Sequence, residues 1–395
     1  MISASGSGGP QTSLVVIQGT PFCNINCSYC YLAQRDDKSR ITLPMIDKIV
    51  ARLAEWNRFA SEVTILWHSG EPLVLEPAFY AAAFDKLLTL QANGINISHA
   101  LQTNATLVSE GHCRVLNEYQ VSVGVSLDGP QDMHDAHRLT RAGTGTFAQT
   151  IKGIERLRAH GILPSAIAVL SKYAMRQPLR FYETFEQLGI PFVGLNTQEK
   201  EGVNRDSFFD DPEVSTALYQ SFLREIFRLS LRRGTVLFRE LVTFADLIRS
   251  GQFSVVSSEA TLGTILSFTH DGRYGTYSPE LLDVTHASFG AFAVGNVQDD
   301  SVEAVLSSLD RGTIGRHIQA GIIRCRSECD YFSICGGGSP ANKLGEAGQL
   351  DITETAHCRF SKKLVLDVVM ELLEDAALRR LAHRAIDTYT RHRLL

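Results

Sequence analysis

The sequence predicts an α/β protein: a partial barrel of six βα units followed by a smaller cysteine-rich domain. Two observations lead to this prediction. Between residues 13 and 197, a short apolar run, a polar loop and an amphipathic helical pattern recur six times, as in parallel strands joined by helices. Beyond residue 197 the periodicity changes, and four of the eight cysteines fall between Cys325 and Cys358.

The six apolar runs are nearly continuous, as expected for strands that are buried on both faces of a sheet. Gly94, Gly161 and Gly189 stand where the intervening helices should end. Six units are too few for a closed eight-stranded barrel, so we expect a curved, partly open barrel of the TIM type. The runs span residues 14–18, 63–67, 97–102, 121–127, 166–170 and 192–196.

The pattern divides the chain into four segments: a flexible Ser/Gly-rich lead-in, the barrel, a bridge, and a C-terminal domain with closing helices. Within the bridge, residues 265–278 alternate around a turn at Asp271–Gly272 and predict a β-hairpin. The four segments are residues 1–12, 13–235, 236–322 and 323–395.

The composition is that of a globular protein, with 44% hydrophobic and 21% charged residues. The net charge of -5 argues against a nucleic-acid-binding surface. No run approaches the ~20 apolar residues of a membrane span, and the N-terminus lacks the basic start and apolar core of an export signal. We therefore expect a cytoplasmic protein with no membrane or nucleic-acid partner, whose clustered cysteines bind metal or act in catalysis.

Unusual polar motifs follow the predicted strands at their carboxyl ends. In parallel barrels this rim carries ligands and chemistry, so we expect the motifs to form one active site. They are three cysteines after the first run, "HSGEP" at 68–72, Thr103–Asn104, "SLDGP" at 126–130, and Leu195–Asn196.

Cys23, Cys27 and Cys30 offer three thiolates, one fewer than a closed structural zinc site uses. In a four-iron cube held by three thiolates, one iron is open to a small molecule. A zinc ion completed by His68 or by another distant residue is the alternative.

The C-x3-C-x2-C spacing, with Tyr29 before the last cysteine, resembles the signature of radical S-adenosylmethionine (SAM) enzymes. Residues 68–72 resemble the Gly-Gly-Glu-Pro motif of that superfamily, with His68–Ser69 as a variant opening. The resemblance covers residues 13–200.

This resemblance implies that Cys23, Cys27 and Cys30 hold a [4Fe–4S] cluster whose open iron binds SAM. Reductive cleavage of SAM would release a 5′-deoxyadenosyl radical, which abstracts a hydrogen atom from the substrate. An external electron donor of the flavodoxin or ferredoxin type would reduce the cluster.

The resemblance also implies which residues contact SAM. Tyr29 would contact the adenine, and Gly70 and Glu71 the methionine amino end. A turn at Asp128, a helix cap at Thr103–Asn104 and a salt-bridge cluster around Arg138 are the structural alternatives. The remaining expected contacts are Ser69, Thr103, Asn104, Ser126, Asp128, Arg138 and Leu195.

The second cysteine set supplies four thiolates, as a closed site requires, and zinc is an alternative occupant. Its context resembles a SPASM domain, the iron–sulfur module of radical SAM enzymes that act on peptides, which implies an auxiliary [4Fe–4S] cluster. Ser339 stands where a further cysteine is expected, and Tyr277 stands near another such position, so we expect two clusters in total. Cys113 is expected to be an inert helix residue. The set is Cys325, Cys329, Cys335 and Cys358.

The widest resemblance is to cyclophane-forming (triceptide) radical SAM/SPASM maturases paired with Gly-rich repeat precursor peptides. The stretches "TPFCNINCSYCYL", "WHSGEPL" and "CGGGSPANKLGE" carry it. It implies removal of a Cβ hydrogen, attack on an aromatic ring within three residues, and loss of one proton and one electron. Sulfatase-maturing relatives use an aspartate as the base where this chain has Ser278, which leaves Glu280 and Asp283 as nearby candidates.

Two other peptide modifications on the same scaffold are alternatives: formylglycine formation on a sulfatase and a thioether cross-link. The absence of an aspartate at Ser278 argues against the first. A non-catalytic zinc-binding scaffold that docks protein partners is an alternative of another class.

Overall fold

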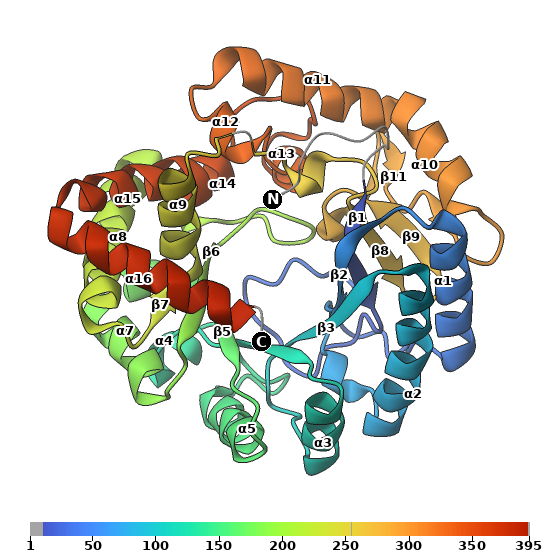
Figure 1. The fold of residues 1–395 in the computed structure, drawn as a ribbon, viewed down its shortest axis with the longest axis horizontal. Helices are drawn as coiled ribbons and strands as arrows, with labels where there is room; N and C mark the ends of the chain where they lie inside the picture. Colours follow the sequence, from blue (N-terminus) through green and yellow to red (C-terminus); the bar gives the residue numbers. More distant parts are fainter. Residues whose placement is uncertain (1–10, 254, 394–395) are drawn as a thin grey trace.

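The computed structural model describes residues 11–253 and 255–393. Its centre is a ten-stranded sheet that curves into an open barrel, with helices on the outside (Figure 1). The six predicted strands are all present and pair in parallel in chain order. They are β1 (Thr12–Gln18), β2 (Phe59–Trp67), β3 (Asn96–Thr103), β4 (Ser122–Ser126), β5 (Ser165–Leu170) and β6 (Phe192–Thr197).

The helices between these strands form where the amphipathic patterns predict them. Gly94, Gly161 and Gly189 adopt φ values of +77°, +77° and +60° at the ends of these segments, the left-handed conformation of a helix C-terminus. The helices are α1 (Leu43–Trp56), α2 (Pro77–Leu88), α3 (Glu110–Glu118), α4 (Gln131–His134), α5 (Phe147–Ala159), α6 (Lys172–Met175) and α7 (Pro178–Gln187).

The sheet extends beyond the six predicted strands at both ends. The predicted hairpin forms as β8 (Ile265–Thr269) and β9 (Arg273–Thr276), but β8 pairs in parallel with β1 and so belongs to the barrel sheet rather than to a separate bridge. All five residues of β8 are buried, and their pairing covers an edge of β1 that would otherwise be open. At the other end, β7 (Leu237–Phe238) pairs with β6.

The predicted lead-in ends earlier than expected. Residues 1–10 lie outside the described part of the chain, and Thr12 is already the first residue of β1. Its hydroxyl is buried and donates a hydrogen bond to the carbonyl of Gly263 at 2.6 Å.

The C-terminal half adds helices on one side of the barrel and a second, smaller apolar core. α15 (Leu364–Glu374) and α16 (Ala376–Arg393) pack against α8 (Pro212–Arg233) and α9 (Arg239–Ser250). α10 (Val302–Arg311) lies beside the β8–β9 hairpin, and α11 (Thr313–Glu328) runs from there toward α12 (Phe332–Cys335) (Figure 1). Tyr277, Phe292, Ile318 and Leu344 belong to the second core. No helix in the described residues is both long and apolar enough to cross a membrane.

The remaining helices are α13 (Pro340–Ala347) and α14 (Ala356–Cys358). The remaining short strands are β10 (Thr285–His286), β11 (Gly290–Ala291) and β12 (Gly295–Asn296).

Candidate active site at the open end of the barrel

Cys23, Cys27 and Cys30 lie on the loop that follows β1, and none of them forms a disulfide. The loop after β4 holds this cysteine loop through backbone hydrogen bonds. The amide of Asn26 donates to Leu139 at 2.7 Å, and the amide of Ser28 donates to His137 at 3.0 Å. Two of the predicted motifs therefore meet at the carboxyl rim of the barrel.

Two side-chain N–H groups point at the sulfur atoms of this loop. Asn104 Nδ2 lies 3.8 Å from Cys23 Sγ, and Arg138 Nη1 lies 3.9 Å from Cys27 Sγ. Burial, followed by the charge of Glu71, raises the pKa of Cys23 to about 12. This sulfur therefore needs the positive charge of a metal to become a thiolate ligand.

The donor set of the first loop fits an iron–sulfur cube better than a single ion. The three thiols influence one another electrostatically, and N–H donors toward the sulfurs are what such clusters use. Across the described residues, no three His, Cys, Asp or Glu side chains lie close enough to hold one metal ion, with or without His68.

The loop after β2 makes a close approach to the cysteine loop that only glycine allows. Ser69 and Gly70 both have positive φ values, +77° and +58°. A Cβ atom at Gly70 would lie 2.5 Å from the carbonyl oxygens of Thr20 and Phe22. The backbone of the "HSGEP" motif is thereby pressed against the chain that leads into the cysteines.

Glu71 is a buried link between the rim loops. Its carboxylate accepts hydrogen bonds from the Thr103 hydroxyl at 2.6 Å, the Asn104 amide at 2.8 Å and the Leu73 amide at 2.9 Å. The alternative role of Thr103 and Asn104 as a helix cap is not what the structure shows, because Ser109 caps α3. Both residues instead join the end of β3 to the "HSGEP" loop.

Asp128 and Arg138 form a buried two-pronged ion pair. Arg138 Nε and Nη2 donate to Asp128 at 3.0 and 3.1 Å, the Tyr29 hydroxyl donates to the same carboxylate, and the Val169 amide adds a bond at 2.9 Å. Burial alone would raise the pKa of Asp128, but Arg138 and these donors lower it overall. Asp128 thus does more than form a turn, and it orients Arg138 toward Cys27.

Two expected SAM contacts lie farther along the sheet. The Ser126 hydroxyl accepts a hydrogen bond from Gln102 Nε2 at 3.0 Å. The Leu195 side chain belongs to the main core, and its amide donates to Glu240 at 3.1 Å. Ser126 is the last residue of β4, as predicted, whereas Leu195 lies two residues before the end of β6.

A group of four glutamates near the barrel rim was not singled out as a group from the sequence. We call Glu199, Glu201, Glu259 and Glu280 the carboxylate cluster. Asn342 Nδ2 on α13 donates to Glu199 at 2.8 Å and to Glu201 at 3.0 Å. The position of Glu199 and Glu201 directly after the sixth apolar run was the signal available in the sequence.

The structure separates the two candidate bases. Burial, followed by the charge of Glu259, raises the pKa of Glu280 to about 8. Asp283 lies on the surface and pairs with Arg273 at 3.0 Å. Of the two, Glu280 is the less exposed residue, and its raised pKa suits a general base.

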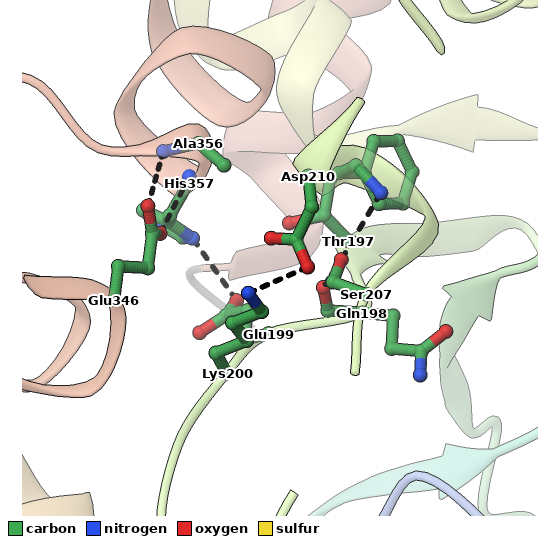
Figure 2. A pocket seen from close by; sticks show the side chains of 10 residues that line it. Thr197, Gln198, Glu199, Lys200, Ser207, Asp210, Glu346, Ala356 and His357 are labelled. Carbon is green, nitrogen blue, oxygen red and sulfur yellow. Dashed lines mark hydrogen bonds and ion pairs between the residues drawn. The ribbon is translucent and has the colours of Figure 1, made fainter. Parts of the chain in front are cut away.

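A small pocket borders the carboxylate cluster on the side of α14 (Figure 2). There the His357 ring contacts Glu199 at 3.0 Å, and the Lys200 ammonium pairs with Asp210 at 2.7 Å. Glu346 accepts hydrogen bonds from the amides of Ala356 and His357. The loop after β6 is thus joined to the segment that carries Cys358.

Cys325 lies in the last turn of α11 and Cys329 directly follows that helix, whereas Cys335 ends α12 and Cys358 ends α14. Cys325 interacts electrostatically with Cys329 and Cys335, and so does Cys358. None of the four forms a disulfide. The four thiols offer the number of ligands that an iron–sulfur cube uses, but in the described residues no three of them lie close enough to hold a single ion. Cys113 lies apart from them, buried on α3.

The positions where further cysteines were expected hold other groups. The hydroxyls of Ser278 and Ser339 lie 3.0 Å apart, and Ser278 donates to Glu259 at 3.1 Å. Tyr277 is 1% exposed and sits in the second core. The Ser339 hydroxyl and the Tyr277 ring therefore occupy the expected cysteine positions, and Ser278 occupies the position of the relatives' aspartate.

Comparison with known proteins shows the family. Residues 17–181 match the Radical SAM superfamily. The chain is 34% identical over 373 residues, 93% of each chain, to "Uncharacterized protein sll1766" of Synechocystis sp.. It is 25% identical to the "Serine-type anaerobic sulfatase-maturating enzyme" of Bacteroides thetaiotaomicron, over 82% of this chain and 81% of that one.

A solved structure shares the fold. "Native anSMEcpe with bound AdoMet and Kp18Cys peptide" superimposes with a TM-score of 0.75 at 20% identity, over 93% of this chain and 99% of that chain. The family match begins in β1 and includes the cysteine loop, the "HSGEP" loop and the Asp128–Arg138 pair described above. With its three thiols at the carboxyl rim of a partial barrel, this chain belongs to the radical SAM superfamily.

Proposed function

We propose that this protein modifies a ribosomally made precursor peptide, joining the Cβ atom of one residue to a nearby aromatic ring as a three-residue cyclophane. The observation that carries the proposal is the meeting, at one rim, of the cysteine loop and an enclosed carboxylate cluster. The sequence likeness to cyclophane-forming maturases supports the reaction type. The relatives named as sulfatase-maturating enzymes, and the likeness to an enzyme solved with a peptide, support a peptide substrate.

When bound, the cluster and SAM supply a 5′-deoxyadenosyl radical that removes a hydrogen atom from the substrate. Cys23, Cys27 and Cys30 would hold the cluster, and Arg138 and Asn104 would donate hydrogen bonds to its sulfur ligands. Residues on the adjoining rim loops would position SAM. They are Tyr29, Ser69, Gly70, Glu71, Thr103, Ser126, Asp128 and Leu195.

The proposed reaction balances as the loss of two hydrogens from the peptide. One hydrogen atom leaves Cβ to form 5′-deoxyadenosine, and the carbon radical bonds to the ring. Restoring aromaticity then releases one proton and one electron. A base with a pKa near the working pH suits this proton, and we assign the role to Glu280.

The electron needs an acceptor inside the protein. We assign this role to an auxiliary [4Fe–4S] cluster held by Cys325, Cys329, Cys335 and Cys358. The first cluster would receive its own electron from an external donor of the flavodoxin or ferredoxin type.

Formylglycine formation on a sulfatase is the second candidate, because several relatives are named as anaerobic sulfatase-maturating enzymes. Ser278 argues against it: its hydroxyl is bonded to Ser339 and Glu259 and offers no carboxylate. Glu280 would have to take that role in either reaction.

The test is to incubate the reduced, iron-loaded enzyme with SAM and with each of two peptides, and to analyse the products by tandem mass spectrometry. One peptide carries Gly-rich repeats with aromatic residues, and the other carries a sulfatase maturation sequence. We expect the first to lose two hydrogens and to resist fragmentation within a three-residue stretch. Formylglycine in the second peptide, with the first unchanged, would overturn the cyclophane assignment.

A variant with Cys23, Cys27 and Cys30 all replaced by alanine is the control. It should form no 5′-deoxyadenosine. Cleavage of SAM by this variant would contradict the assignment of the first cluster to these residues.

A further inference from the structure

Lys343 is a buried cation whose only described side-chain partner is a sulfur atom. It lies on α13 and is 4% exposed, and its Nζ atom is 3.6 Å from Cys325 Sγ. Within residues 11–253 and 255–393, no carboxylate lies within ion-pair distance of this ammonium. The sequence motif "CGGGSPANKLGE" contains Lys343, but the residue was not singled out from the sequence.

The surroundings leave space for the ammonium but offer it little charge. Gly321 lies on α11 one turn before Cys325, and a Cβ atom there would come within 2.9 Å of Lys343 Nζ. Gly338 lies against the Lys343 stem, with Cε 3.7 Å from the position of an added Cβ. Glycines on two sides therefore admit the side chain into the second cysteine set.

A buried ammonium is costly unless a negative charge compensates it. A neutral thiol is a weak hydrogen-bond acceptor and carries no charge. Four thiolates around a cube with a 2+ core carry a net charge of about -2, and one added electron makes it -3. Such a centre would supply the missing counter-charge at Cys325.

We infer that Lys343 compensates the charge of an anionic iron–sulfur centre on the second cysteine set and raises the reduction potential of that centre. The inference rests on the auxiliary cluster of the proposed function. Because the reduced form carries one more negative charge, a nearby ammonium stabilises it more than the oxidised form. The oxidised cluster takes up one electron from the substrate radical more readily as a result.

The residue before Lys343 on α13 contacts the carboxylate cluster, to which the proposed base belongs. Asn342, also on α13, holds Glu199 and Glu201 through two hydrogen bonds. One helix thus presents Lys343 to the proposed electron acceptor and Asn342 to the carboxylate cluster. Lys343 acts through the cluster and is a positioning and tuning residue, without contact to the substrate.

The experiment uses the full chain with Cys23, Cys27 and Cys30 replaced by alanine, so that only the second set can bind iron. After anaerobic reconstitution, iron is counted, and the midpoint potential is measured by a redox titration followed by electron paramagnetic resonance. Lys343→Met and Lys343→Arg are compared, with Lys152→Met on the exposed face of α5 as a control for the change in net charge.

We expect about four irons per chain. The ratio of reduced to oxidised cluster at a fixed potential should fall at least tenfold in Lys343→Met, which corresponds to about 59 mV for one electron. Lys343→Arg should keep most of the potential, and Lys152→Met should not change it. An unchanged potential in an iron-loaded Lys343→Met would overturn the inference.

Two further outcomes are decisive. If the neutral variants Lys343→Met and Lys343→Gln lose iron while Lys343→Arg binds it, the need for a positive charge supports the inference, whereas loss in all three overturns it. Zinc, or no metal, on the second set of the unsubstituted lysine protein overturns both this inference and the auxiliary cluster. SAM cleavage by the wild-type enzyme tests the radical function separately, because that reaction uses the first set alone.

Discussion

Gly202 lies directly against the carbonyl oxygen of Tyr31, so that a Cβ atom at position 202 would come within 2.1 Å of it. The amide of Val203 donates a hydrogen bond to the same oxygen at 3.0 Å. Tyr31 follows Cys30, and Gly202 follows Glu201. This contact therefore joins the cysteine loop to the loop that carries Glu199 and Glu201, two members of the carboxylate cluster.

The first prediction concerns this contact. Gly202→Ala should displace the cysteine loop and lower the rate of SAM cleavage about tenfold or more, because small misplacements of reacting groups are costly. Gly234→Ala is the matched control: Gly234 has a similar φ of +69°, against +52° for Gly202, but nothing lies within 4 Å of an added Cβ. Equal losses in the two variants would show that backbone strain, not the contact, is responsible.

The second prediction concerns the buried ion pair. Asp128→Asn removes the counter-charge of Arg138 and should lower the free energy of unfolding by about 3–5 kcal/mol. Asp132→Asn breaks a solvent-exposed pair with Arg180 and should cost at most about 1 kcal/mol. Denaturant unfolding of the metal-free proteins measures both. Similar costs would mean that the buried pair does not need its charge.

The third prediction concerns pH. Because the pKa of Glu280 is raised to about 8, its carboxylate form, and with it the rate of peptide cross-linking, should increase as pH rises through about 8. Glu280→Gln should abolish this increase and lower cross-linking by about 10²-fold or more. Asp283→Asn should leave the profile unchanged. An unaltered profile in Glu280→Gln would exclude Glu280 as the base, provided that SAM cleavage is measured in parallel.

The fourth prediction separates the two cysteine sets. Cys358→Ala should retain most SAM cleavage and lose most cross-linked product, because in the proposed function the first set drives cleavage and the second accepts the electron. Both rates are measured on one sample by chromatography and mass spectrometry. A parallel loss of cleavage and product would assign the second set a structural role.

The sequence predicted what depends on local patterns. Each of the six apolar runs forms a strand, and Gly94, Gly161 and Gly189 end helical segments. Both features depend on residues that are close together in the sequence. The hairpin at residues 265–278 was also predicted, but its parallel pairing with β1 was not. That pairing joins segments about 250 residues apart, and no local signal specifies it.

The features of the site also fall into those that local sequence predicts and those that depend on tertiary packing. The cysteine motifs and Glu71 could be found from spacing, whereas the engagement of Glu71 by Thr103 and Asn104 depends on how neighbouring strands align. Glu280 was named from the sequence as a candidate base, but Lys343, Glu199, Glu201 and Glu259 were missed, because a charged residue in a loop or short helix is usually solvated. Lys343 and Glu201 are buried where α13 packs against the loop after β6.

The position of β1 in the sheet has a consequence for how the enzyme matures in the cell. β1 is paired on one side with β2 and on the other with β8, and Val16 and Ile17 are almost fully buried. The strand that leads into the first cysteine set is thus anchored by backbone pairing and packing that need no iron. Its amides should exchange slowly with solvent even in the apoprotein. Cluster assembly factors would then meet a scaffold already folded, and oxygen damage that strips the iron would leave a chain ready to be reloaded.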